Sequence, residues 1–479
     1  MKPLAAASKA VRKYIANLGE KTSFHSPAPL LARGVFDAVD KPASDRLTAG
    51  FGKEKIIPPD LFRKKYYIAG YGPNKPATGI LDLPFAHALW LDDNSGRGGV
   101  VFVSLDAVGF MNIDVERVRA QLGAFGAQTG CRSINVMSTH NHAGIDTMGL
   151  WGQLPMTGKN KRYMKVVYAA IEKAVRKAYE DARACTAWLG EIEVEGLQED
   201  IRLPEVYSKT LTRVRFVPDD GSREIYFINF AAHSESLGGK NTLVSADHPC
   251  YLRREIKKEA GAETFYCVGA IGGMISMNND TESPETTMKL GRDLAGFALS
   301  IDNETKLESV INILRQEFYL EADNSALMAA ARAKILEARE YGLGWASLGI
   351  GLKSEMSYVE IGSLRLLLLP GEIFPELVYG GYLDADHSAC GDPPAFNPEP
   401  LAAIAGGEPL VIIGLANDEI GYIVPPNDFL LDSEAPYFTQ PRDRLGRKHY
   451  EETNSLGPNT APKIAEVFAD MMQTVRLAK

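Results

Sequence analysis

Short apolar segments alternate along this chain with longer amphipathic ones, and this alternation limits the possible fold more than any other feature. The apolar segments predicted to be strands are residues 99–105, 133–138, 225–230, 263–268, 364–369 and 410–415. Apolar residues recur at helical spacing in residues 163–183, 290–299, 325–340 and 461–477. Because several of the strands lack a polar face, both faces of their sheet should be covered. The sequence therefore predicts a layered α/β fold, with a mixed β-sheet core flanked by helices.

The character of the sequence changes near residue 45. Before that point, residues 7–18 fit one amphipathic helix, and Pro29 and Pro42 interrupt the pattern that follows. After residue 60 the sequence has no fixed-period repeat, no low-complexity tract and no Pro-rich or Ser-rich linker. We therefore predict a partly helical N-terminal extension at residues 1–45 and a single domain at residues 46–479.

Charge and cysteine content narrow the class of protein. With 61 acidic and 52 basic residues, the net charge of -9 gives no electrostatic reason to expect a nucleic-acid partner. The five cysteines are scattered without a CxxC pair, which favours reduced thiols and a cytoplasmic location. Lysine and arginine interrupt the N-terminal apolar patch, unlike in a secretory signal. No segment of about twenty apolar residues is present to span a bilayer.

His140 and His142 are the most informative polar residues of the chain. They follow the apolar segment 133–138 and are separated by Asn141. If the strand continues through them, its period of two places both imidazoles on one face and Asn141 on the other. Such a pair suits a metal ion, and a structural histidine pair is an equally good interpretation of the motif alone.

Three further segments supply ligand-like residues where predicted strands end. His233 follows the strand at 225–230, Glu372 follows the run 364–369, and Tyr422 lies after the run 410–415. HExxH, GxSxG and Walker A signatures are absent, so a site must be assembled from distant segments. Each of the three residues has a structural explanation when taken singly. Together, two imidazoles, a carboxylate and an oxygen donor suit Zn²⁺.

The order of these segments resembles the neutral ceramidase family, zinc amidases that cleave the amide bond of N-acylsphingosine. The blocks that carry the resemblance are THNHAG at 139–144, NFAAHSES at 229–236, PGE at 370–372 and NDEIGYIVP at 417–425. The resemblance implies the catalytic domain of that family, without the immunoglobulin-like domain of its secreted members. It also implies Zn²⁺ as the cofactor and a small-molecule substrate, with an N-acyl lipid as one candidate.

The resemblance implies roles for individual residues. The implied zinc ligands are His140, His233, Glu372 and Tyr422. His142, or alternatively Glu372, would manage protons, His142 being the better candidate because neutral imidazole titrates near working pH. Tyr450 and Arg202 would stabilise the oxyanion of the tetrahedral intermediate. Ser276 would remain from a substrate-binding block, residues 272–278, that otherwise departs from the family pattern. The residues alone leave open which histidine of the 140/142 pair binds the metal.

Three functions are compatible with these observations. The first is a zinc-dependent hydrolase that cleaves an amide or related acyl bond with metal-activated water. The second is a metal enzyme on the same scaffold that acts on a different small polar substrate, as the changed 272–278 block would allow. The third is a catalytically inactive binding protein, which would hold no stoichiometric metal. The oligomeric state is not predicted.

Overall fold

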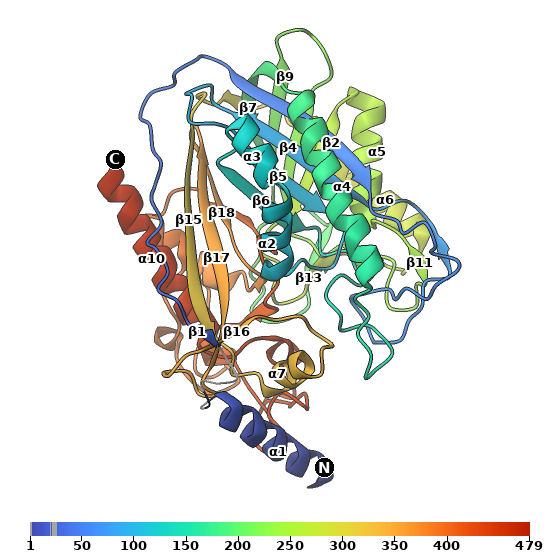
Figure 1. Cartoon of the computed structure of the whole chain (residues 1–479), viewed down its shortest axis with the longest axis vertical. Coiled ribbons are helices and arrows are strands. Elements are labelled where there is room, and N and C mark those ends of the chain that lie inside the picture. The colour runs from blue at the N-terminus through green and yellow to red at the C-terminus, as the bar shows by residue number, and fades with distance from the viewer. Residues whose placement is uncertain (1, 20, 22–25) are drawn as a thin grey trace.

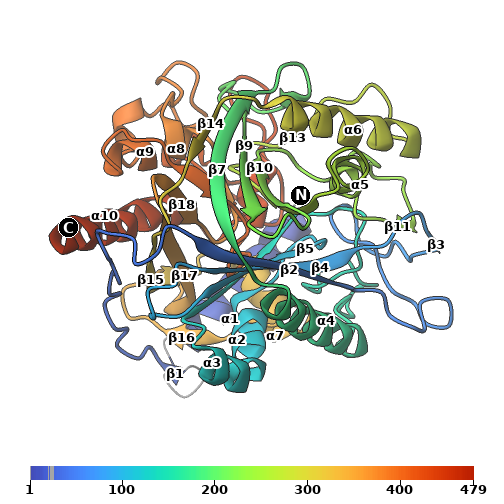
Figure 2. The ribbon, with the colours of Figure 1, turned by 90° about the horizontal axis from the view of Figure 1, so that it is seen from above.

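The computed structural model describes residues 2–19, 21 and 26–479. It contains two large twisted sheets with helices on their outer sides. Figure 1 shows α10 (Thr460–Ala478) on one side of the molecule and α4 (Lys161–Glu180) on the other, with the strands between them. Figure 2 gives the same arrangement from above. The layered, mixed α/β fold expected from the sequence is therefore confirmed.

The larger sheet is mixed, and its strands do not follow one another in chain order. From edge to edge it contains β12 (Glu263–Val268), β10 (Ile225–Phe230), β9 (Thr210–Pro218), β7 (Arg183–Glu193), β2 (Leu47–Lys55), β4 (Phe85–Asp92), β5 (Val100–Leu105) and β6 (Ser133–Ser138), with β14 (Glu304–Lys306) beside β7. The pairs β10–β12 and β5–β6 are parallel, and the neighbouring pairs between them are antiparallel.

The smaller sheet is also mixed. It contains β1 (Ser26–Pro27), β16 (Glu340–Gly342), β17 (Ile350–Ile361), β18 (Leu364–Leu368) and β20 (Val411–Ile413), with β15 (Ile311–Glu321) paired along β17. Three short pairs complete the strands: β3 (Gly79–Ile80) with β11 (Leu243–Val244), β8 (Gln198–Asp200) with β13 (Ile275–Met277), and β19 (Glu372–Ile373) with β21 (Tyr422–Ile423).

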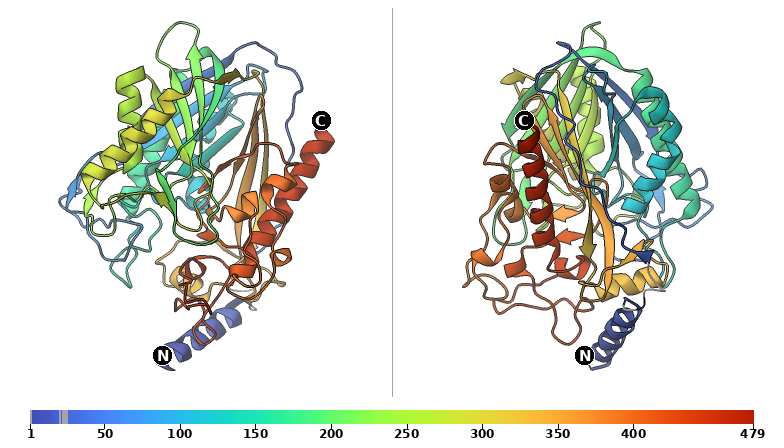
Figure 3. Two further views of the ribbon diagram at one scale, coloured as in Figure 1. Left: turned by 180° about the vertical axis from the view of Figure 1, so that it is seen from behind. Right: turned by 60° about the vertical axis from the view of Figure 1, so that its left-hand side comes forward.

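The remaining helices cover the sheets and their ends. They are α1 (Lys2–Gly19), α2 (Asn112–Gln121), α3 (Gly123–Thr129), α5 (His248–Ala260), α6 (Pro284–Ser300), α7 (Ser325–Arg332), α8 (Glu376–Tyr379) and α9 (Leu401–Ile404). Short 3₁₀ turns occur at Pro394–Phe396, Pro426–Asp428 and Glu451–Asn454. The two views in Figure 3 show α5 and α6 outside the larger sheet and α10 outside the smaller one.

Alternating side chains of single strands enter different cores. In β18, Leu366 and Leu368 belong to the core between the two sheets, whereas Leu367 belongs to the core shared with α10. In β5, Phe102 faces the core between the sheets and Val103 faces the core shared with α4. Each strand is therefore buried on both faces, which explains why these segments are continuously apolar and not alternating.

One predicted helix is wrong over half of its length. The segment 325–340 was expected to be helical throughout, but α7 ends at Arg332 and Glu340 already begins β16. Lys334 has a φ of 58°, a left-handed conformation that an α-helix cannot continue through. Leu336 and Glu337 then line the cavity described below. The apolar spacing thus belonged partly to a loop that packs against the rest of the molecule.

The N-terminal segment packs onto the rest of the chain. Ile15 of α1 is fully buried in a cluster with Met328 of α7, and Arg12 pairs with Asp323 at 2.7 Å. The proposed boundary near residue 45 stays a prediction, and part of the extension lies outside the described residues. Among the helices that the structure describes, none combines the length and apolarity needed to cross a bilayer.

Candidate metal centre

Polar side chains from four distant segments meet where strands of both sheets end. His140 and His142 follow β6, His233 follows β10, and Glu372 follows β18. Backbone pairing joins these exits, because Asn141 bridges to Ser234 and Met137 bridges to Ala416. Glu372 lies directly opposite Tyr422 in the β19–β21 pair. Residues almost 300 positions apart are therefore held in register by main-chain hydrogen bonds.

The His140–His142 pair does not lie in an extended strand, contrary to the expectation from its spacing. β6 ends at Ser138, and His140 has a φ of 53°, a left-handed conformation that is uncommon outside glycine. The side-chain amide of Asn141 points away from the site, and its Nδ2 donates to the carbonyl of Ser245 at 2.7 Å. The two rings nevertheless enter the same site, with centroids 4.6 Å apart. A turn, held by the surrounding structure, therefore places both imidazoles in one site, which the sequence had assigned to an extended strand.

His140 and His233 both direct Nε2 at one carboxylate oxygen. Glu372 Oε2 lies 3.3 Å from His140 Nε2 and 3.1 Å from His233 Nε2. On the other side of each ring, Nδ1 lies 2.8 Å from a backbone carbonyl, Val108 O for His140 and Ile275 O for His233. Carbonyls only accept, so Nδ1 of each ring is the donor on that side, and Nε2 of each ring is left to face the Glu372 carboxylate.

This arrangement fits a divalent metal ion. Metal-binding histidines usually donate their second ring nitrogen to a carbonyl or carboxylate, which fixes the tautomer and the ring orientation. Ring nitrogens of His140, His142 and His233 lie within 4.8 Å of one another, and all three residues are buried. Burial alone would raise the pKa of the Glu372 carboxyl, but the neighbouring His140 and His233 hold it well below its usual range. The donor set is of the N and O type that zinc accepts.

Tyr422 and Tyr450 lie beside this cluster. Both line the cavity next to Glu372, and their rings meet edge to face with centroids 6.1 Å apart. The Tyr422 hydroxyl contacts Met274 Sδ at 3.2 Å. Burial and the negative charge of Glu372 raise the pKa of Tyr450 to about 12. Tyr450 therefore carries a proton at neutral pH and is available as a hydrogen-bond donor.

His142 belongs to a separate network around Glu235, a residue that sequence reasoning did not select. His142 Nδ1 lies 3.2 Å from Glu235 Oε2. Tyr71 donates to the same oxygen at 3.0 Å, and Ser276 donates to Glu235 Oε1 at 2.5 Å. The signal that could have found Glu235 is its place in the polar run directly after His233. The structure thus brings Ser276 to the site as a partner of Glu235.

Burial and charge act in opposite directions within this network. Burial lowers the pKa of His142, and the nearby carboxylate of Glu235 opposes that effect. Burial would raise the pKa of Glu235, but His142 and His233 hold it well below its usual range. The result is a neutral imidazole held by an ionised carboxylate, which is the usual arrangement around a histidine that accepts a proton during catalysis.

Gly70 gives His142 the space it occupies. The glycine has a φ of 98°, and a Cβ added to it would lie 2.3 Å from His142 Cγ. Any other residue at this position would be strained and would displace the imidazole. The same loop continues into Tyr71, whose ring meets His142 edge to face.

Arg202 is buried among carboxylates. Its guanidinium lies 2.8 Å from Asp428, 2.6 Å from Glu451 and 2.8 Å from Glu452. Glu451 adjoins Tyr450 in the chain, so these ion pairs fix the segment that carries Tyr450. Among the described residues, no hydrogen bond joins Arg202 to the histidine cluster. Its proposed role as an oxyanion donor stays a prediction.

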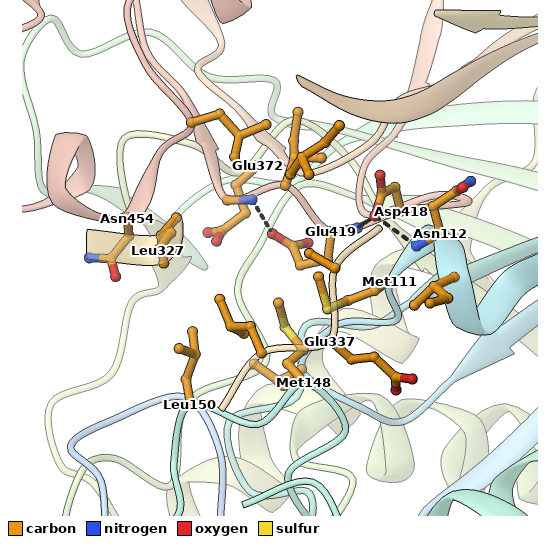
Figure 4. A pocket seen from close by; sticks show the side chains of 18 of the residues that line it. Met111, Asn112, Met148, Leu150, Leu327, Glu337, Glu372, Asp418, Glu419 and Asn454 are labelled. Atoms are coloured by element: carbon orange, nitrogen blue, oxygen red, sulfur yellow. Dashed lines mark hydrogen bonds between the residues drawn. The ribbon is translucent and has the colours of Figure 1, made fainter. Parts of the chain in front are cut away.

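The cluster lies at the wall of a deep, mostly apolar cavity. Met111, Met148, Leu150 and Leu327 line it together with Glu372, as Figure 4 shows. Segments from α2, α7, the loop after β6 and the loop before β21 supply the lining. An apolar cavity with a few polar groups at one place is the usual form of a small-molecule site.

Glu419 is a second acidic residue in the cavity that sequence reasoning missed. Its Oε1 accepts a hydrogen bond from the Gly421 amide at 2.9 Å, as Figure 4 shows, whereas its buried Oε2 has no hydrogen-bond partner among the described residues. Burial and the charge of Glu372 raise the pKa of Glu419 well above its usual range. A buried polar atom without a partner is costly, so a substrate group or water is expected there.

Comparison with known proteins supports the resemblance seen in the sequence. Residues 63–294 match the family described as neutral/alkaline non-lysosomal ceramidase, N-terminal. The neutral ceramidase from Pseudomonas aeruginosa is similar in structure, with a TM-score of 0.66 at 15% sequence identity over 91% of this chain and 75% of that chain. A ceramidase complexed with C2 gives a TM-score of 0.66 at 16% identity over 91% of this chain and 76% of that chain. No curated protein sequence matches this chain.

Proposed function

Residues 63–294 match the N-terminal region of the neutral/alkaline ceramidase family, and on this similarity we propose that the chain is a zinc-dependent hydrolase of N-acyl (amide) bonds. The observation that carries the proposal is the convergence of His140 Nε2 and His233 Nε2 on Glu372, with both Nδ1 atoms held by backbone carbonyls. His140, His233, Glu372 and Tyr422 would hold the ion. Bound zinc supplies Lewis-acid polarisation of a carbonyl and an acidified water.

His142 is proposed to manage the protons of the reaction. Its Nδ1 faces Glu235, which leaves Nε2 to accept a proton from the attacking water. The same nitrogen then returns the proton to the amine that leaves. Glu235 stabilises the imidazolium formed between these steps, and Ser276 and Tyr71 hold Glu235 in place. The proposal therefore takes His140, and not His142, as the metal ligand of the pair.

Tyr450 is proposed to stabilise the developing oxyanion. It lines the cavity beside Glu372 and remains protonated at neutral pH. One such donor contributes about 3 kcal/mol to lowering the barrier. Arg202 would then act through the segment that it fixes, as a positioning residue for Tyr450.

The apolar lining supports a substrate with a hydrocarbon chain. Met111, Met148, Leu150 and Leu327 offer no hydrogen bonds to a polar ligand, and burying a chain against them is favourable. Glu419 supports the second candidate, a more polar substrate, because its Oε2 needs a partner inside the same cavity. A hydroxyl or amine group on an N-acyl substrate would satisfy both features.

Hydrolysis of N-acyl amines of graded acyl length, followed by product analysis, tests the proposal. We expect a free fatty acid and an amine in equal amounts, loss of activity on chelation and its return with Zn²⁺. Longer acyl chains should lower KM until the cavity is filled. Turnover of polar substrates alone would favour the second candidate. No turnover of either class, together with no bound metal, would favour a binding protein.

A further inference from the structure

A basic hollow lies on the surface outside the candidate metal centre, between two neighbouring loops. It is lined by Lys64, Lys65, Tyr67 and by residues 157–162, which lead into α4. The cations Lys64, Lys65 and Lys161 are exposed, and no ion pair joins them to other described residues. Arg162 is also exposed, with a side chain 75% accessible and only a distant carboxylate, Asp60, at 3.9 Å.

The charge of this surface is opposite to that of the whole chain. Asp60 is the one acidic residue within segments 60–67 and 153–165, while the chain as a whole carries a net charge of -9. Lys159, at the base of the hollow, is buried and neutralised by Asp114 at 2.6 Å. The cations at the rim keep their charge available to an external anion. A local excess of this kind attracts anionic groups, despite the acidic balance elsewhere.

Large apolar side chains stand exposed on the same two loops. Phe62 is 74% exposed, and Leu154 and Met156 are each 58% exposed. Phe62 lies two residues before Lys64, and Met156 adjoins Thr157 in the wall of the hollow. Exposed apolar residues on the same loops as exposed cations are typical of proteins that bind the interface of an anionic membrane, where the ring or alkyl group enters the headgroup region.

The loop that carries Leu154 and Met156 also reaches the substrate cavity. Leu150 and Trp151, a few residues earlier, line that cavity, and the Trp151 carbonyl accepts a hydrogen bond from Asn74 at 3.0 Å. Asp146 holds the start of the loop, because one of its carboxylate oxygens accepts from the Gly149 amide at 2.6 Å. A membrane bound at Leu154 and Met156 would therefore contact residues that are only a few positions along the chain from the apolar wall of the cavity.

We propose that Phe62, Leu154 and Met156, together with Lys64, Lys65, Lys161 and Arg162, form a docking surface for an anionic lipid membrane. The cations contact lipid phosphate and carboxylate groups, and the three apolar side chains enter the interface. Binding of the membrane is independent of the proposed function. A further consequence is that a bilayer-embedded substrate reaches the cavity along the 150–156 loop, and this consequence rests on the proposed function.

Vesicle co-sedimentation with the full chain tests the docking surface. We expect the wild-type protein to bind phosphatidylcholine vesicles that contain phosphatidylserine, to bind neutral vesicles poorly, and to be released by salt. K64E/K161E should weaken binding at least about tenfold, since each substitution turns an attraction into a repulsion. F62S/L154S should weaken it as well, with less dependence on salt. The matched control K289E/K306E reverses exposed lysines on α6 and β14, and should bind as the wild type does.

Three results would overturn the proposal. Equal binding by K64E/K161E and the control would show that the surface is not involved. Equal binding to neutral and anionic vesicles would remove the role of charge. Displacement of the protein from vesicles by low concentrations of inorganic phosphate would identify a site for free anions in place of a membrane surface.

A parallel assay separates this inference from the proposed function. H233A should lose hydrolysis but keep vesicle binding. K64E/K161E should lose activity on a vesicle-embedded N-acyl substrate and retain it on a water-soluble one. Vesicle binding without any hydrolysis by the wild type would refute the proposed function and leave the docking surface intact.

Discussion

At the scale of single residues, the site separates two kinds of histidine by what faces Nδ1. Backbone carbonyls face Nδ1 of His140 and His233, which leaves Nε2 of each ring for the proposed metal ion. A carboxylate, Glu235, faces Nδ1 of His142, which prepares that ring to become positively charged. His140 and His142, although only two positions apart, therefore have different hydrogen-bonding and charged surroundings.

Replacing His142 by alanine should remove catalysis and leave the metal in place. The rate constant kcat should fall by about 10² to 10⁴, the usual contribution of a proton-transfer residue. Glu235→Gln should cause a smaller fall of about 10- to 100-fold, because the imidazole remains but loses its charged partner. Steady-state kinetics with metal analysis of each variant checks this. Loss of zinc from the His142 variant would mean that His142 is a ligand.

Tyr450→Phe should lower kcat by about 10² while KM and metal content change little. The substitution removes the hydroxyl and keeps the ring that packs against Tyr422. The measurement is kcat and KM on one N-acyl substrate. Full activity in the phenylalanine variant would exclude the oxyanion role.

Glu376 makes the stability of the protein depend on pH. Burial, with the charge of Asp200, raises its pKa from 4.5 to about 8. Between these values the folded protein holds a proton that the unfolded chain has lost, so stability falls as pH rises from about 4.5 to about 8. Glu376→Gln should match the wild type near pH 5 and be more stable near pH 9, by on the order of a few kcal/mol. Urea unfolding at both values measures this, and parallel pH profiles would contradict it.

At the scale of elements, each central strand contributes to two cores at once. Leu368 of β18 packs between the sheets, and Leu367 packs toward α10. Both are fully buried. A strand with one solvent-exposed face would tolerate substitution at every second position. In β18 the side chains on both faces are packed, so adjacent positions should both be sensitive to substitution.

Leu367→Ala and Leu368→Ala should therefore destabilise the protein by similar amounts, about 2–5 kcal/mol each. The comparison is made by denaturant unfolding of the two variants. A cost at only one of these adjacent positions would show that β18 has an exposed face and that one of the two cores is absent.

The central strands and helix α4 were predictable because the apolar pattern that marks them lies within each segment. The apolar runs at 225–230 and 263–268 coincide with β10 and β12. The end of α7 was not predictable, because the apolar spacing continues past Lys334 and does not reveal its left-handed φ. The same limit explains the missed acidic residues. Glu235 and Glu419 gain their surroundings from segments far away in the sequence, and only the position of Glu235 directly after His233 is a local signal.

At the scale of the whole molecule, the strands of the two sheets lead both to the candidate metal centre and to the loop that carries the proposed docking surface. Main-chain pairing at the strand ends holds the histidines and Glu372, and the loop after β6 extends from the cavity wall to the exposed apolar residues. The five cysteines are unpaired, as expected from their spacing, with Cys390 exposed and Cys185, Cys250 and Cys267 buried. The cytoplasmic location stays a prediction.

Bound metal tests the central claim most directly. Elemental analysis of protein purified without added metal or chelator should find about one zinc per chain in the wild type. H233A should lose it, because His233 Nε2 faces Glu372 inside the buried cluster. H387A is the matched control, since the His387 side chain is 65% exposed in a surface loop and pairs with Asp384, and it should keep the zinc. Wild-type protein without metal, even after zinc is supplied, would contradict the account.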